Sequence, residues 1–130
     1  MTTRHKILVV DDRPENIFSL ESMLASDNRD ILTAASGNEA LRIAYNEPLS
    51  LILLDVQMPG MDGFEAMQKI RNELNLKSLP IIAVTAKAMK GDGDKCKEAG
   101  ASDYLPKPVS KEKLINSIAY WLNINKAIAV

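Results

Sequence analysis

The stretch LILLDVQMPGMDG, residues 51–63, decides the fold. Its first four residues are apolar without alternation, which is typical of a strand covered on both faces of a parallel sheet. The run ends on Asp55 and then breaks into a loop that contains Pro59, Gly60 and Gly63. A carboxylate beside a core costs free energy unless a partner stabilises its charge. The stretch therefore predicts a buried strand whose last residue meets a counter-charge.

Similar apolar runs alternate with helical patterns along the whole chain. The expected strands are residues 7–10, 31–35, 51–54, 81–84 and 103–105. Each is followed by a segment in which apolar residues recur at helical spacing. Because crossovers between parallel strands are right-handed, the alternation predicts an α/β fold: a five-stranded, doubly wound parallel sheet with helices on both faces.

Residues with known positional preferences mark the ends of the expected helices. Pro14 suits a first turn, and Ser36 with Glu39 has the spacing of a capping box. Gly100 suits the position just after the fourth helix, and Ser110 suits the N-cap of the fifth.

Two glycines, Gly91 and Gly93, lie where the fourth helix should begin. Each costs a helix interior about 1 kcal/mol relative to alanine. We therefore expect this helix to start late or to have a weakly held first turn. Residues 123–130 are expected to form a short tail after the last helix.

Length and composition predict one globular domain over residues 1–130, with a core of about 6–123. Apolar residues make up 46% of the chain and charged residues 25%, the balance of a soluble protein. The net charge of -1 argues against direct binding to nucleic acid or to an anionic membrane. The chain shows neither a bilayer-length apolar run nor a signal-peptide pattern, and it has a lone cysteine, Cys96. We therefore expect a cytoplasmic location.

Polar residues follow the expected strands at the point where each strand ends. Asp11 and Asp12 follow the first strand, Asp55 ends the third, Thr85 ends the fourth, and Lys107 follows the fifth. Because sites in open parallel sheets form beyond the carboxyl ends of the strands, these side chains should gather at one rim.

This rim has a place for a cation and a place for an anion. Three carboxylates in one crevice repel each other, and a hard divalent cation such as Mg²⁺ removes the conflict. Lys107 would bind a phosphate as a point charge. Attack by an aspartate on phosphorus gives an aspartyl phosphate. Asp55 is the expected nucleophile because it stands alone, whereas the adjacent Asp11 and Asp12 suit metal binding.

Four motifs carry a family resemblance. They are VVDD (9–12), LLDVQMPGMDG (53–63), VTA (84–86) and GASDYLPKP (100–108). In this order and spacing they resemble the receiver domain of two-component response regulators, from residue 7 to about 122. The resemblance implies a single receiver domain with a flavodoxin-like fold and strand order 2-1-3-4-5. Residues 85–109 look most like receivers attached to hybrid histidine kinases.

The resemblance also implies a role for each matching residue. Asp55 is implied as the phosphoacceptor. The implied Mg²⁺ ligands are Asp11, Asp12, Asp55 and the backbone carbonyl of Gln57. The implied phosphoryl-binding groups are the Thr85 hydroxyl, the Ala86 amide and the Lys107 ammonium.

Thr85 and Tyr104 are implied as the switch, with Tyr104 turning inward as Thr85 shifts. Gln57 and Lys87 match positions that tune dephosphorylation in the family. The Lys107–Pro108 bond is expected to be cis, which is almost confined to bonds before proline.

The function implied is a phosphorylation-activated signalling switch. Asp55 would accept a phosphoryl group from a histidine kinase or histidine phosphotransfer protein in a Mg²⁺-dependent reaction. The surface of the fourth helix, fifth strand and fifth helix would then change and control a downstream protein or a covalently linked domain. A second copy of the chain is a further expected partner, in a phosphorylation-linked dimer through that surface. Such a chain is not a turnover enzyme, since it catalyses only its own phosphorylation and dephosphorylation.

Two rival functions fit less well. A phosphatase of the haloacid-dehalogenase type needs a second aspartate two residues after its nucleophile, where this chain has Gln57. A flavodoxin-like electron carrier needs a phosphate loop rich in Ser, Thr and Gly after its first strand, where this chain has the acidic DDRPEN (11–16).

Plainer interpretations of single residues stay open. Thr85 alone could be an ordinary strand residue, and Tyr104 alone is more often a core or edge aromatic. Trp121 is expected to pack on the last helix. Two origins also stay open, a stand-alone regulator and a receiver cut from a larger hybrid protein.

Overall fold

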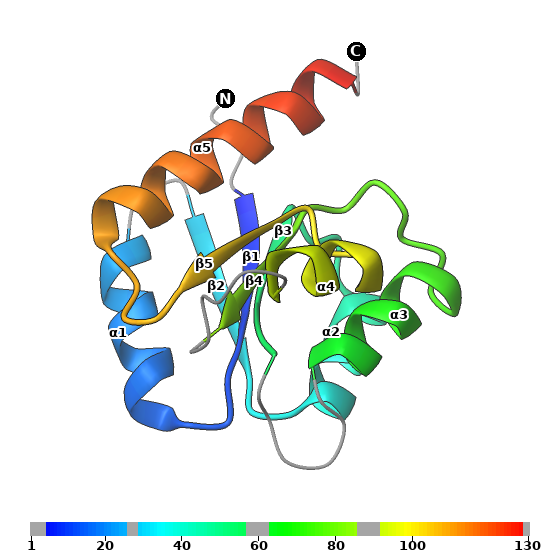
Figure 1. Cartoon of the computed structure of the whole chain (residues 1–130), viewed down its shortest axis with the longest axis horizontal. Coiled ribbons are helices and arrows are strands. Elements are labelled where there is room, and N and C mark those ends of the chain that lie inside the picture. Colours follow the sequence, from blue (N-terminus) through cyan, green and yellow to red (C-terminus); the bar gives the residue numbers. More distant parts are fainter. Residues whose placement is uncertain (1–4, 26–28, 57–62, 86–91, 129–130) are drawn as a thin grey trace.

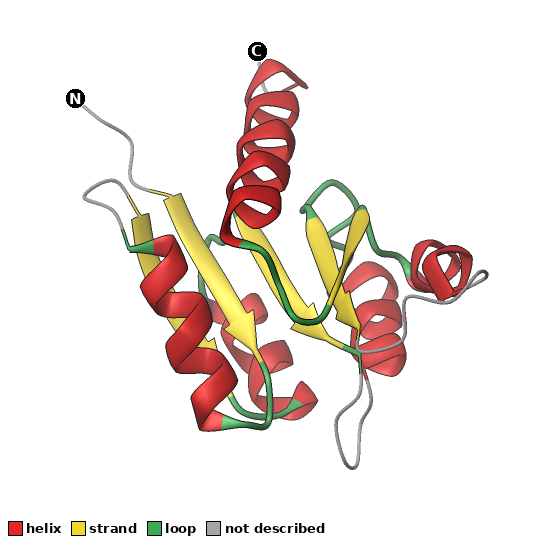
Figure 2. Ribbon diagram, turned by 60° about the vertical axis from the view of Figure 1, so that its left-hand side comes forward, coloured by secondary structure: helices red, strands yellow, loops and turns green. Residues whose placement is uncertain are grey.

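Five parallel strands form one sheet. The computed structural model describes residues 5–25, 29–56, 63–85 and 92–128, with the backbone alone at 92–94 and 123–128. The strands are β1 (His5–Val10), β2 (Arg29–Ala34), β3 (Leu51–Asp55), β4 (Ile81–Thr85) and β5 (Asp103–Pro106). Their order in the sheet is β2-β1-β3-β4-β5, which confirms the predicted order and the doubly wound parallel topology. The strand arrows all point the same way (Figure 2).

Five helices cover the two faces of the sheet. They are α1 (Pro14–Leu24), α2 (Gly37–Asn46), α3 (Gly63–Asn72), α4 (Asp92–Ala99) and α5 (Lys111–Ile128). Figure 1 shows α1 and α5 on one side of the sheet and α2, α3 and α4 on the other. Among the described residues, no helix is both long enough and apolar enough to cross a bilayer.

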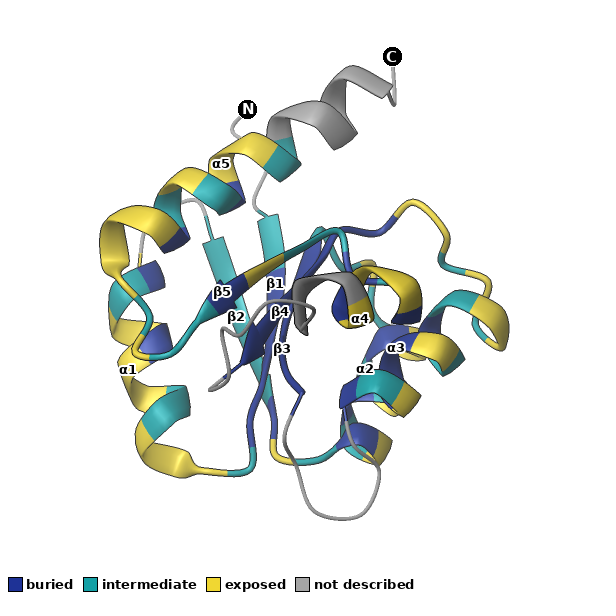
Figure 3. Cartoon of the chain, in the orientation of Figure 1, coloured by how far each residue is buried: buried dark blue, intermediate teal, exposed yellow. Residues whose placement is uncertain are grey.

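Alternate residues of β1 and β3 enter two separate cores. Leu8 and Ile52 pack with residues of α2, α3 and α4. Ile7 and Leu53 point the other way and pack with α1 and α5. All five residues of β3 are buried, so the middle of the sheet is dark blue in Figure 3. The unbroken apolar run at 51–54 is thus explained by helices on both faces.

Most helix ends lie where the sequence predicts them. Pro14 lies in the first turn of α1, and the Ser36 Oγ accepts a hydrogen bond from the Glu39 amide at 3.2 Å. Gly100 has φ 122°, which suits a residue without Cβ at the end of α4. The Ser110 Oγ accepts from the Lys113 amide at 3.5 Å, which is a long N-cap bond.

The last helix differs from the prediction. Residues 123–128, expected as a tail, continue α5 to Ile128. These six residues contain neither proline nor glycine, so no residue type there stops the helix. At the start of α4, the helix begins at Asp92. Gly91 lies outside the described residues, and the weakly held first turn stays a prediction.

Gly63 allows α3 to begin against the end of β3. A Cβ at this position would lie 2.4 Å from the Val56 Cα and 2.6 Å from the Asp55 carbonyl oxygen. The Gly63 amide also donates to the Val56 carbonyl at 3.1 Å. Both close atoms belong to the backbone, so they cannot move aside as a side chain could.

Gly63→Ala should therefore destabilise the fold. We expect the free energy of unfolding to fall by about 1–3 kcal/mol, the usual cost of overpacking a rigid site. Urea denaturation followed by circular dichroism measures it. The exposed Gln68→Ala on the same helix is the control and should stay within about 0.5 kcal/mol of the parent. Equal effects of the two changes would contradict the steric account of Gly63.

Candidate metal centre at the carboxyl ends of the strands

Three aspartates meet at the carboxyl ends of β1 and β3. Asp11 and Asp12 follow β1, and Asp55 is the last residue of β3. One carboxylate oxygen from each lies within 4.8 Å of one from each of the others. Asp11 and Asp55 are 1% and 3% exposed, whereas Asp12 is half-buried. The cluster is thus a crevice with a closed floor and one side open to water.

The sheet register forces this meeting. Val10 lies opposite Leu54, so the residues that follow them lie at the same edge of the sheet. The backbone also orients Asp11: its amide donates to the Ala34 carbonyl at 3.1 Å, and its Oδ1 accepts from the Arg13 amide at 3.0 Å. The Asp11 carboxylate is therefore held in place and is not free to turn away from its neighbours.

Lys107 reaches into the crevice from the segment after β5. Its Nζ lies 3.4 Å from the Asp11 Oδ2 and 3.3 Å from the Asp55 Oδ2. The Lys107 amide donates to the Thr85 carbonyl at 2.8 Å, which ties this segment to the end of β4. The Lys107–Pro108 bond is cis, as predicted.

The single charge of Lys107 does not balance three carboxylates. Carboxylates this close repel each other, and a further positive charge relieves the repulsion. The donors are all oxygens, and the half-buried Asp12 leaves room for water. Mg²⁺ prefers oxygen ligands and keeps several waters. The residues present therefore fit a magnesium ion.

Thr85 lies at the same rim. It ends β4, is 3% exposed, and pairs in register with Pro106, next to Lys107. The structure thus brings Asp11, Asp55, Thr85 and Lys107 together as the sequence predicts, with Asp12 beside them. Three further predicted positions, Gln57, Ala86 and Lys87, lie outside the described residues.

Of the two aromatic residues singled out from the sequence, one is on β5 and the other on α5. Tyr104 is on β5 and is 37% exposed. Trp121 packs partly buried against the core of α1 and α5, which confirms the packing predicted for it. The switch role of Tyr104 stays a prediction.

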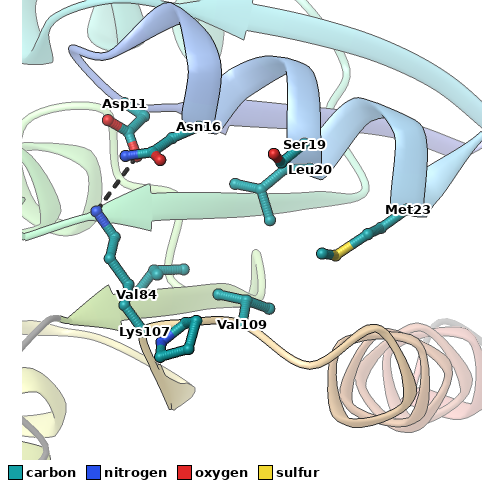
Figure 4. A pocket seen from close by; sticks show the side chains of 9 residues that line it. Asp11, Asn16, Ser19, Leu20, Met23, Val84, Lys107 and Val109 are labelled. Atoms are coloured by element: carbon teal, nitrogen blue, oxygen red, sulfur yellow. Dashed lines mark hydrogen bonds and ion pairs between the residues drawn. The ribbon is translucent and has the colours of Figure 1, made fainter.

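A cavity of about 410 Å³ opens beside the crevice. Figure 4 shows its polar end, where Asp11, Asn16 and Lys107 come together, with the apolar Leu20 and Met23 farther along α1. The sequence motifs did not indicate that these α1 residues line a site. Their spacing, with Leu20 four residues after Asn16 and Met23 three after that, is the helical signal that could have found them.

Comparisons with known proteins agree with this geometry. The profile of the response regulator receiver domain family matches residues 7–119. The chain is similar to the sensor protein GacS of Pseudomonas syringae pv. syringae, with 36% identity over 122 residues, which cover 92% of this chain and 14% of GacS. It is also similar to Protein PilH of Pseudomonas aeruginosa, with 35% identity over 113 residues, 87% of this chain and 93% of PilH.

A solved structure shares the fold over almost the whole chain. It is the receiver domain of a sensor histidine kinase from Pseudomonas aeruginosa PAO1, with a magnesium ion coordinated in its active site cleft. The TM-score is 0.84 and the identity 36%, over 93% of this chain and 99% of that one. With the strand order, the acidic crevice and the profile match in agreement, this chain belongs to the response regulator receiver domain family.

Proposed function

We propose that this receiver domain is a phosphorylation-activated switch with Asp55 as its phosphoacceptor. The observation that carries the proposal is the crevice in which three carboxylates and the Lys107 ammonium meet. No part of this arrangement is needed to close the hydrophobic core, and buried charges are costly unless they are paired. A site that binds a cation and an anion together accounts for it.

Asp11, Asp12 and Asp55 would hold Mg²⁺, together with the carbonyl of Gln57 from outside the described residues. When bound, the ion supplies positive charge beside the oxygens of the transferring phosphoryl group. The acidic cluster and the magnesium ion in the neighbouring solved structure both support this cofactor.

In the proposed reaction, an oxygen of the Asp55 carboxylate attacks phosphorus in line with the leaving group. The new O–P bond forms as the P–N bond to the donor histidine breaks, and the electron pair of that bond stays on the imidazole nitrogen. Lys107 Nζ already lies 3.3 Å from the Asp55 Oδ2, so a phosphoryl group on Asp55 would come within its reach. Lys107 then stabilises charge that develops during transfer, while the Thr85 hydroxyl donates to a phosphoryl oxygen.

The proposed response starts at Thr85 and reaches the surface of α4, β5 and α5. A shift of Thr85 toward the phosphoryl group would open space into which Tyr104, now 37% exposed, could turn. Tyr104 lies opposite Ala83, two residues before Thr85 on β4. A local charge would thus bias an element with two packings, as in other phosphorylation switches.

The proposed donor is a histidine kinase or a histidine phosphotransfer protein, and the proposed recipient is a downstream protein or a linked domain. The similarity to GacS supports a linked domain, because the chain covers only 14% of GacS. The similarity to PilH supports a separate downstream protein, because the chain covers 93% of PilH. A dimer through the α4, β5 and α5 surface is part of the same proposal. The proposed catalysis is limited to phosphorylation and dephosphorylation of the domain itself.

Asp55→Asn should abolish labelling of the protein by acetyl phosphate in Mg²⁺, because the amide has no carboxylate oxygen to attack phosphorus. Intact-protein mass spectrometry measures the added phosphoryl group. Asp30→Asn, the same exchange at the amino end of β2, is the control and should label normally. Undiminished labelling of Asp55→Asn would disprove the assignment of the nucleophile.

Asp12→Ala should weaken Mg²⁺ binding by about tenfold or more, since even groups that only support metal ligands contribute tenfold to hundredfold. Isothermal titration calorimetry with MgCl₂ gives the affinity. Glu15→Ala removes an exposed carboxylate from the nearby first turn of α1 and should leave the affinity unchanged. If the two variants titrate alike, Asp12 is not a ligand.

Lys107→Ala should separate metal binding from the response. Removing the ammonium takes a competing positive charge away from the carboxylates, so Mg²⁺ affinity should hold or rise. The amide NMR shifts that beryllofluoride, a stable mimic of a phosphoryl group, produces across α4, β5 and α5 should be lost. The exposed Lys111→Ala is the control. Full shifts in Lys107→Ala would show that the response does not need this ammonium.

A further inference from the structure

Arg71 joins three segments at the end of the sheet opposite the acidic crevice. It lies in the last turn of α3. Its Nε donates to the Gly100 carbonyl at 2.9 Å, and its Nη1 donates to the carbonyls of Leu76 and Leu79, both at 2.6 Å. Its Nη2 lies 3.4 Å from the Ser102 Oγ. The guanidinium thus connects α3, the loop before β4 and the turn between α4 and β5.

All these acceptors are neutral. Burial lowers the pKa of Arg71 from its ordinary value, yet a guanidinium stays protonated in proteins. A charged donor strengthens each hydrogen bond, and the rigid fork of arginine presents several N–H groups at once. The Gly100 carbonyl lies just after α4, so the positive charge also suits the negative end of that helix dipole.

Gly100 makes this approach possible. Its φ of 122° favours glycine, and a Cβ there would lie 2.8 Å from the Arg71 Cγ. The turn is also closed from within, because the Ala101 amide donates to the Cys96 carbonyl at 2.9 Å. The end of α4 is therefore fixed both by its own backbone and by α3, the helix beside it (Figure 1).

The beginning of β5 is tied down next to this turn. The Ser102 amide donates to the Ile81 carbonyl at 2.7 Å, and the Ser102 Oγ accepts from the Ile81 amide at 3.1 Å. The Asp103 Oδ2 accepts from the Ser117 hydroxyl at 3.1 Å and from the Trp121 indole at 3.2 Å. Residues 100–103, the β5 anchor, are thus bound to α3, β4 and α5.

We propose that Arg71 is a positioning residue that fixes the β5 anchor as the hinge of the switch. The inference rests on the proposed function. Thr85 and Lys107, which face the phosphoryl group, lie at the other ends of β4 and β5. With residues 100–103 held by three elements, a displacement at the Thr85 end turns the α4, β5 and α5 surface about the anchor. Without the anchor, residues 100–103 move as well, and the same displacement no longer turns the α4, β5 and α5 surface.

The first test measures the anchor in the absence of Mg²⁺ and phosphodonor. Arg71→Lys keeps the charge, but one ammonium cannot span acceptors that lie on two separate segments. Hydrogen exchange followed by NMR should show protection of the Ala101 and Ser102 amides falling by about tenfold or more, the factor expected for hydrogen bonds from a charged donor. Arg42→Lys, the same substitution at an exposed residue of α2, should leave the protection of the Ala101 and Ser102 amides unchanged. Unchanged protection in Arg71→Lys would overturn the anchor.

The second test adds Mg²⁺ and beryllofluoride to the same proteins. In the parent, the amide shifts should change at Leu105 and stay nearly constant at residues 100–103. In Arg71→Lys, labelling of Asp55 by acetyl phosphate should persist while shift changes spread into the anchor. A residue that contributes only stability would leave the pattern of shifts as in the parent. Parent anchor amides that shift as much as Leu105 would refute the hinge.

Ser102→Ala covers the case in which Arg71→Lys does not fold. It removes the acceptor of the Ile81 amide and one acceptor of Arg71, so protection at Ala101 should fall measurably below that of the parent. No change there would also overturn the anchor. If the parent takes up no phosphoryl label, the proposed function fails, while the exchange experiment still decides whether Arg71 holds residues 100–103.

Discussion

The contact of Lys107 with Asp11 and Asp55 is the interaction on which the site depends. The neighbouring strands β1 and β3 bring these carboxylates together, and the two apolar cores hold those strands in place. The sheet therefore cannot relax to separate the charges. The Lys107 ammonium offsets part of the repulsion between the carboxylates. The crevice therefore still favours further positive charge. The hydrophobic packing of the whole domain thus places an acidic cluster that fits a metal ion at one edge of the sheet.

The two ends of β4 and β5 differ in the kind of group that holds them. At the carboxyl ends, Thr85 and Lys107 lie at the rim of the acidic crevice, where the proposed phosphoryl group would change the charge. At the amino ends, Arg71 and Asp103 bind backbone carbonyls, a hydroxyl and an indole, in a network whose charges do not depend on phosphorylation. One end can therefore respond while the other holds. A packed core transmits strain because it resists continuous deformation. A displacement that starts at the carboxyl ends of β4 and β5 would therefore be resisted at their amino ends.

Sequence reasoning could predict the site because chain order and strand direction determine it. Once the apolar runs are assigned to a parallel sheet, Asp11, Asp55 and Lys107 must lie at one edge. Arg71 could not be found in this way, because its partners are mostly backbone carbonyls, which leave no trace in the residue types. The cavity beside α1 needed three-dimensional packing for the same reason. The extension of α5 to Ile128 was missed because helical residues and tail residues have similar composition when no glycine or proline intervenes.

The most direct test of cation binding by the crowded carboxylates is the structure of a crystal grown in MgCl₂. We expect an ion in the crevice, with the oxygens of Asp12 and Asp55 among its ligands, Asp11 close by, and the Lys107 ammonium still beside Asp55. Carboxylates turned away from one another, with no ion between them at millimolar Mg²⁺, would contradict it. The charge cluster would then have no cation to meet, and the phosphoryl chemistry built on it would lose its basis.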